Sequence, residues 1–163
     1  MLFKWASQFA KIGNTLRFPG LSNSIKVYVD AKILNVHDVA LPREAYVGYF
    51  VEGRKLQGVR KLEEAELDRI GRLESDDAEI LAILFAIEKL KGTMGRFTIV
   101  CDHESVVSEA NKVEEVKNPS VLMEDLREAL RDNQQSIRLE ALRANPAHGI
   151  ITAYVNTLKS QTG

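Results

Sequence analysis

Hydrophobic and polar residues first alternate along this chain with the period of β-strands. In residues 25–30, IKVYVD, apolar side chains alternate with Lys and Tyr, and AYVGYFVEG at 45–53 predicts a second strand. A third strand is expected within KLQGVRKLEEAEL, residues 55–67. Because no helical period separates these segments, we expect them to form an antiparallel meander.

The period then changes to that of a helix. Asp76 and Asp77 are suited to cap a helix that continues to Lys91 and is apolar around most of its circumference. Such a helix is expected to be buried against the sheet. The run RFTIVCD, residues 96–102, is continuously apolar, which is typical of a central strand covered on both faces.

The second half of the chain predicts three more helices and one more strand. Helices are expected around 105–111 and from Pro119 to about Asp132. SIRLEALR at 136–143 predicts the last strand, and 149–159 the last helix. The predicted order is β-β-β-α-β-α-α-β-α, an α/β domain with a mixed five-stranded sheet in which three antiparallel strands precede the parallel ones.

The first 23 residues differ in character from the rest. NTLRFPGLSNS has the Pro-Gly and Ser-Asn pairs of a linker, so we divide the chain into an appendage, residues 1–23, and a domain, residues 24–163. If the appendage is helical, one stripe of it is apolar, comprising Leu2, Trp5, Phe9, Ile12 and Leu16. That stripe needs a covering surface. It could be the chain's own domain, a second copy of the chain (self-association), a membrane surface or nucleic acid, and the pattern leaves these alternatives open.

Composition narrows the class of protein. With 45% hydrophobic and 28% charged residues, the 163-residue chain has the mixture of one ordinary globular domain. It has no apolar run long enough to span a membrane, no secretory signal pattern and a single cysteine, Cys101, so we expect a cytoplasmic protein without disulfides. The net charge of −1 argues against a surface that binds polyanions everywhere.

Three carboxylates stand where apolar elements begin or end. Asp30 closes the first strand, Glu79 opens the long helix and Asp102 closes the fourth strand. Three converging acids would suit a divalent metal. Taken singly, Asp30 also fits a turn residue at a strand end, Glu79 a first-turn acid ionised by the helix dipole, and Asp102 the N-cap of the next helix. No nucleophile elbow, phosphate-binding glycine loop or zinc spacing supports another enzyme class.

The element order and the three acids together resemble the ribonuclease H-like superfamily, and specifically a ribonuclease HI-type domain. The resemblance covers roughly residues 25–160 and rests on VYVDAK, SDDAEILAILFAIEKL, FTIVCDHESVVSEAN and LRANPAHGIITAYVNTL. It implies a metal-dependent endonuclease that hydrolyses RNA in RNA/DNA hybrids. Asp30, Glu79 and Asp102 would be its catalytic ligands for Mg²⁺ or Mn²⁺. A related metal nuclease acting on structured DNA is a further option.

The chain departs from the family pattern in its last helix. The family's fourth metal ligand is an acid there, and alignment offers Thr152 or Ala153 instead. Nearby, His148 is a candidate catalytic residue, either as a substitute ligand or as an aid to product release. Asp76 stands where the family often has an asparagine that touches substrate. These departures support an alternative hypothesis, a degenerate active site in a weakened or inactive module that binds nucleic acid or a protein partner.

Three basic side chains near the acids are open to two interpretations each. His148 and His103 are either metal ligands or ordinary loop and capping histidines. Lys32 is either a phosphate contact or a charge partner that replaces a metal beside the carboxylates. Imidazole is a poorer ligand for Mg²⁺ than for Mn²⁺ or Zn²⁺.

Overall fold

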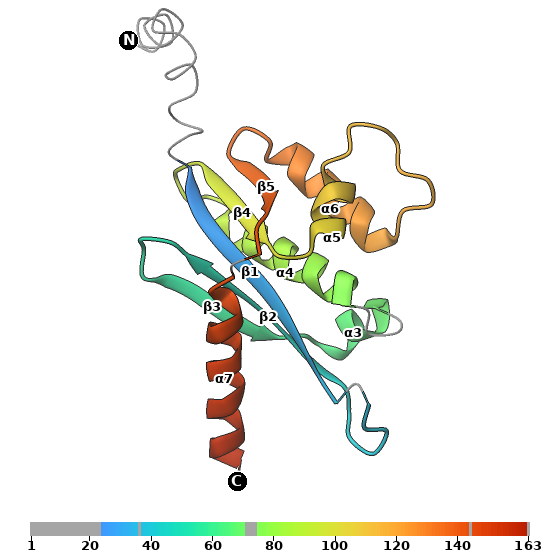
Figure 1. The fold of residues 1–163 in the computed structure, drawn as a ribbon, viewed down its shortest axis with the longest axis vertical. Coiled ribbons are helices and arrows are strands. Elements are labelled where there is room, and N and C mark those ends of the chain that lie inside the picture. The colour runs from blue at the N-terminus through green and yellow to red at the C-terminus, as the bar shows by residue number, and fades with distance from the viewer. Residues whose placement is uncertain (1–23, 36, 71–74, 144, 163) are drawn as a thin grey trace, which may run out of the picture.

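The computed structural model describes residues 24–162 apart from 36, 71–74 and 144 (Figure 1). The appendage 1–23 and the predictions made for it lie outside the described residues. The elements run in the order β1 (Ile25–Leu34), β2 (Glu44–Val51), β3 (Leu56–Lys61), α3 (Glu64–Ile70), α4 (Ser75–Leu90), β4 (Phe97–Cys101), α5 (Glu104–Ala110), α6 (Val121–Asp132), β5 (Ile137–Ala141) and α7 (Ala147–Thr162). None of these helices is long and apolar enough to cross a membrane.

The strands form one mixed sheet in the order β3-β2-β1-β4-β5. β1, β2 and β3 are antiparallel neighbours, and β4 and β5 join β1 as parallel strands. The α/β fold class and the mixed five-stranded sheet predicted from the sequence are therefore confirmed. β1 is the central strand, with β2 on one side and β4 on the other.

The predicted element order lacked one short helix, α3. The third strand lies within the predicted segment but ends at Lys61, and the residues from Glu64 onward are helical. The Glu66 carboxylate accepts a hydrogen bond from the backbone N–H of Glu63 at 2.8 Å, which is half of a capping box. Glu66 also binds the Arg60 guanidinium through two hydrogen bonds, of 2.7 and 2.9 Å. These contacts turn a segment with a strand-like pattern into the start of a helix.

α4 packs against one face of the sheet and forms the centre of the main core. Val27 and Val29 of β1 belong to the same buried cluster as Val47 of β2 and Ile80 and Ile83 of α4. Residues of α5 and α6 complete this cluster, so these three helices share one side of the sheet (Figure 1). Most of α4 is buried, which confirms the prediction of a helix packed against the sheet.

α7 lies on the opposite face of the sheet (Figure 1). Leu34 of β1 and Val59 of β3 pack there. Ile151 and Val155 of α7 form a second buried cluster with Tyr46 of β2. Gly48 allows the close approach, because a Cβ atom at this position would lie only 2.7 Å from Ile151 Cγ1. The strand glycine thus sets the position of the helix that carries His148.

Replacing Gly48 by Ala is expected to destabilise the fold by about 1–3 kcal/mol, because the added methyl group overpacks the contact between β2 and Ile151. Urea denaturation gives the free energy of unfolding. Gly149→Ala is the matched control, since a Cβ there meets nothing within 4 Å and alanine favours the helix by about 0.5–1 kcal/mol. Equal stability of the two variants would show that α7 does not pack this closely on β2.

Candidate active site

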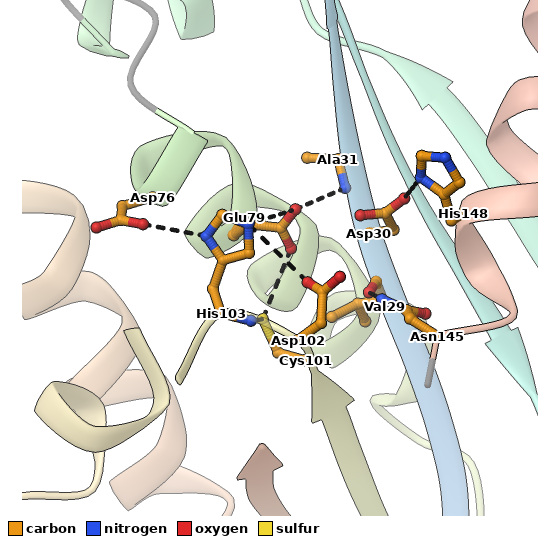
Figure 2. Close-up of polar contacts among 10 residues, drawn as sticks. All are labelled: Val29, Asp30, Ala31, Asp76, Glu79, Cys101, Asp102, His103, Asn145 and His148. Atoms are coloured by element: carbon orange, nitrogen blue, oxygen red, sulfur yellow. Dashed lines mark hydrogen bonds and ion pairs between the residues drawn. The ribbon is translucent and has the colours of Figure 1, made fainter. Parts of the chain in front are cut away.

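The three acids singled out in the sequence converge on one pocket. Asp30 lies within β1, which continues to Leu34 rather than ending at Asp30 as the sequence predicted, because β2 still pairs with it there. Glu79 comes from α4, and Asp102 follows β4 (Figure 2). The pocket has a volume of about 510 Å³, and its lining residues are Asp30, Ala31, Ile33, Ser75, Ala78, Glu79, Asp102, His103 and His148. Asp30 and Glu79 are 4% and 3% exposed, whereas the Asp102 side chain is 34% exposed. Two buried carboxylates therefore face a third that is open to solvent.

The end of the parallel ladder between β1 and β4 creates this convergence. The last pair in that ladder is Tyr28 with Val100, and both aspartates follow two residues later on their strands. Ligand sites in open α/β sheets lie beyond the carboxyl ends of parallel strands, at points where the strand order reverses. β1 is such a point here, because the chain proceeds from it to β2 on one side and returns as β4 on the other.

Side chains satisfy the backbone of β1 just past the ladder. The Glu79 carboxylate accepts a hydrogen bond from the Ala31 N–H at 3.1 Å, and Asn145 Nδ2 donates to the Val29 carbonyl at 2.6 Å. Buried backbone groups that lose a strand partner need such replacements. Glu79 is therefore held against β1, and the start of α7 is tied to the same strand through Asn145.

Glu79 is a buried acid whose charge is unfavourable in the absence of a cation. Burial raises the pKa of Glu79 to about 9, and the negative charge of Asp30 adds to the effect. The sequence suggested that the helix dipole would favour ionised Glu79, and that prediction is wrong. Glu79 is the fifth residue of α4, and desolvation outweighs the helix end at this depth.

Cys101 lies beneath the acids rather than among candidate nucleophiles. The buried thiol donates a hydrogen bond to Glu79 Oε2 at 3.6 Å. Burial and the neighbouring Glu79 raise the pKa of the Cys101 thiol. A thiol that stays protonated is a poor nucleophile, so the site has the character of a carboxylate centre.

His103 lies between three carboxylates, a position that the sequence left open. Its Nδ1 is 3.0 Å from Asp76 Oδ1, and its Nε2 is 3.8 Å from Glu79 Oε1 and 3.9 Å from Asp102 Oδ1 (Figure 2). His103 is also the N-cap residue of α5, but its side chain makes no capping hydrogen bond. The N-cap position considered for Asp102 is therefore occupied by His103, and the His103 ring faces the acids.

His148 approaches the acids from α7. Its Nδ1 is 2.9 Å from Asp30 Oδ2, although the histidine side chain itself is 69% exposed (Figure 2). His148 is the second residue of α7, which begins two residues before the predicted helix. A histidine at the helix start thus contacts the carboxylate at the centre of the sheet.

Thr152 and Ala153, the two positions aligned with the family's fourth acid, do not line the acid pocket. Thr152 Oγ1 accepts a hydrogen bond from Lys32 Nζ at 3.4 Å, so Lys32 contacts α7. Ala153 lines a separate hollow of about 560 Å³ between β3 and α7. No aspartate or glutamate occurs anywhere in α7. Of the α7 residues considered for the site, His148 is the one that lines the acid pocket.

The donor set of the pocket fits a divalent metal ion. Glu79, Cys101 and Asp102 each place a potential ligand atom within 4.8 Å of the others. Carboxylate oxygens are the ligands that Mg²⁺ and Mn²⁺ prefer, and a cation would offset the cost of ionising the buried Glu79. Glu79 and Asp102 are therefore the carboxylates spaced to share such an ion, whereas Asp30 lines the same pocket but lies outside this group of ligand atoms.

Solved structures show that the chain has a ribonuclease H-like fold, as its resemblance implied. It matches the solution structure of the PFV RNase H domain at 16% identity with a TM-score of 0.55, over 87% of this chain and 94% of that one. It matches LC11-RNase H1, isolated from compost by a metagenomic approach, at 17% identity with a TM-score of 0.54, over 74% and 84%.

The prototype foamy virus protease-reverse transcriptase also matches, at 18% identity with a TM-score of 0.54, over 74% of this chain and 17% of that longer one. LC11-RNase H1 has in addition been solved in complex with an RNA/DNA hybrid. No protein-family model and no curated protein sequence matches the chain. At these identities the structures establish the fold, and activity has to be argued from the site.

The raised pKa of Glu79 predicts a pH-dependent stability in metal-free buffer. The folded state keeps a proton on Glu79 up to about pH 9, whereas the unfolded state releases it near the ordinary value of 4.5. Between pH 5 and 8 the free energy of unfolding is therefore expected to fall as pH rises, by up to about 1.4 kcal/mol per pH unit. Glu79→Gln should remove most of this slope, measured by urea denaturation with a chelator present.

The exposed Glu88 on the same helix provides the control for this measurement. Glu88→Gln should keep the wild-type slope. If the Glu79→Gln variant has the same slope as Glu88→Gln, then Glu79 is ionised in the folded protein despite its burial.

Proposed function

We propose that this chain is a metal-dependent endonuclease of ribonuclease H type that hydrolyses RNA in RNA/DNA hybrids. The convergence of Asp30, Glu79 and Asp102 just beyond the end of the parallel pairing between β1 and β4 is the observation that carries the proposal. The ribonuclease H-like fold of the chain supports it, as does the RNA/DNA hybrid bound to LC11-RNase H1.

Asp30, Glu79 and Asp102 would hold Mg²⁺ or Mn²⁺ in this proposal. Bound ions supply an activated water and stabilise the leaving 3′ oxygen during phosphodiester hydrolysis. Asp30 would complete this set from β1, because it lines the same pocket, its charge acts on Glu79 and its Oδ2 lies 2.9 Å from His148 Nδ1. Glu79 stays aligned through the Ala31 N–H, which fixes one of its carboxylate oxygens.

His148 takes the place of the missing fourth acid in this scheme. Its contact with Asp30 Oδ2 orients that carboxylate from the side of α7, and its exposed ring can reach a bound nucleic acid. Exposure also suits a role in product release, because the ring can leave Asp30 without disturbing the core. Asn145, which donates to the Val29 carbonyl, holds the start of α7 against β1.

A module that binds nucleic acid without cleaving it is the second candidate function. One specific observation favours it: α7 contains no aspartate or glutamate, and the side chain that it places beside Asp30 is His148. Three acids with His148 would then preserve the fold and the surface but activate water poorly. The same experiment separates this candidate from the nuclease.

Purified protein is expected to cleave a labelled RNA/DNA hybrid in Mn²⁺ or Mg²⁺, and Asp30→Asn should abolish this activity. Groups that merely orient a metal ligand are worth about 10- to 100-fold, so loss of the ligand itself is expected to cost at least about 100-fold. Initial cleavage rates on gels report the activity. Single-stranded RNA, duplex DNA and a branched DNA junction serve as comparison substrates.

Asp132→Asn is the matched control for this assay. Asp132 is an exposed acid at the end of α6, near the opposite end of the parallel strands from the pocket. This variant should cleave like the wild type. Cleavage that survives in Asp30→Asn would exclude the acid site, and hybrid binding without cleavage in either metal would favour the binding module.

A further inference from the structure

His103 has the geometry of an oriented metal ligand. Its Nδ1 lies 3.0 Å from Asp76 Oδ1, a hydrogen-bond distance. When Nδ1 carries the proton of a neutral imidazole, the lone pair is on Nε2, the nitrogen that faces Glu79 and Asp102. Metal-binding histidines are usually held in this way, with one ring nitrogen donating to a carboxylate and the other free for the metal.

The distances on the Nε2 side suit an ion between the groups better than direct contacts. The separations from Glu79 Oε1 and Asp102 Oδ1 are 3.8 and 3.9 Å, longer than the 3.2 Å or so of a good hydrogen bond. Ligand atoms on one ion with bonds of about 2.0–2.2 Å lie roughly 3–4.3 Å apart, depending on the angle between them. Each nitrogen–oxygen pair therefore has the spacing of two ligands on one ion, although the atoms that already lie mutually within 4.8 Å belong to Glu79, Cys101 and Asp102, so His103 would join them through a small adjustment of its side chain.

Asp76 acquires a role from the same geometry. It is 53% exposed, and as an acid it would repel a phosphate of the substrate. Beside His103 it instead fixes the orientation of the ring, because Asp76 Oδ1 lies 3.0 Å from Nδ1. A metal on the acids would thus explain why Asp76, in the first turn of α4, and His103, which follows β4, lie side by side.

We propose that His103, positioned by Asp76, is a nitrogen ligand for the metal held by Glu79 and Asp102. The proposal rests on the metal-binding site of the proposed function and adds to it a preference for Zn²⁺ or Mn²⁺ over Mg²⁺. The preference follows because imidazole binds these transition metals well and Mg²⁺ poorly. The competing explanation is that His103 is a cation that neutralises the acids directly and excludes a metal.

Nuclear magnetic resonance of the histidine rings tests the coordination directly. The chain has three histidines, and His103→Gln assigns the signal of His103. In ¹⁵N-labelled protein, Zn²⁺ is expected to shift the Nε2 resonance of His103, and Mg²⁺ at the same concentration is not. The exposed His37, in the connection between β1 and β2, provides the internal control and should not respond to either ion.

Calorimetric titration without nucleic acid measures the contribution of each residue. His103→Gln is expected to weaken Zn²⁺ and Mn²⁺ binding by about 10- to 100-fold while leaving Mg²⁺ affinity nearly unchanged, and Asp76→Asn should weaken Zn²⁺ binding by about 10-fold. His37→Gln should bind all three ions like the wild type. Urea denaturation of each variant confirms that it is folded, and Asp76→Asn gives a second test on an exposed residue.

Two results would overturn the proposal. Equal or tighter Zn²⁺ binding by His103→Gln would show that the imidazole competes with the metal, and an equal loss for all three ions would show that it only supports the carboxylates. The proposed nuclease function can be refuted independently of this inference. Zn²⁺ coordination by His103 without hybrid cleavage keeps this inference and removes the nuclease, whereas cleavage with no dependence of metal affinity on His103 does the reverse.

Discussion

The parallel pairing of β1 with β4 is the constraint on which the site depends. The last pair in this ladder is Tyr28 with Val100, two residues before Asp30 and Asp102. The two strands therefore separate just before the acids. The backbone of β1 then has polar groups without a strand partner. Glu79 and Asn145 satisfy them, and in doing so they fix α4 and the start of α7 around the gap.

The cost of this arrangement is electrostatic. Asp30 and Glu79 are both almost fully buried, and burial together with the charge of Asp30 raises the pKa of Glu79. The protein places a histidine on either side of the acids, His148 against Asp30 and His103 near Glu79. Each ring places a nitrogen beside the carboxylates. A site of this kind is more stable when a positive charge is present than when it is absent.

Much of the architecture was readable from hydrophobic periodicity. The continuous apolar run before Asp102 indicated a covered central strand, and the nearly all-apolar helix after Asp77 indicated a helix packed against a sheet. The periodicity failed at α3, where a single side chain, Glu66, caps the helix and also binds Arg60. Such a local contact overrides a pattern that looks like a continuing strand. The prediction that Glu79 is ionised failed for a non-local reason. Burial raises its pKa, and burial depends on the whole fold.

The sequence by itself determined the order of strands and helices apart from α3, and it singled out the three acids, because side-chain periodicity and residue type are local properties. Only the tertiary structure decided which other groups stand beside those acids. His148 contacts Asp30 across 118 residues of chain, and Asp76 meets His103 across 27. Such pairs depend on the packing of α7 over Gly48 and on the end of the β1–β4 ladder, which no local pattern encodes.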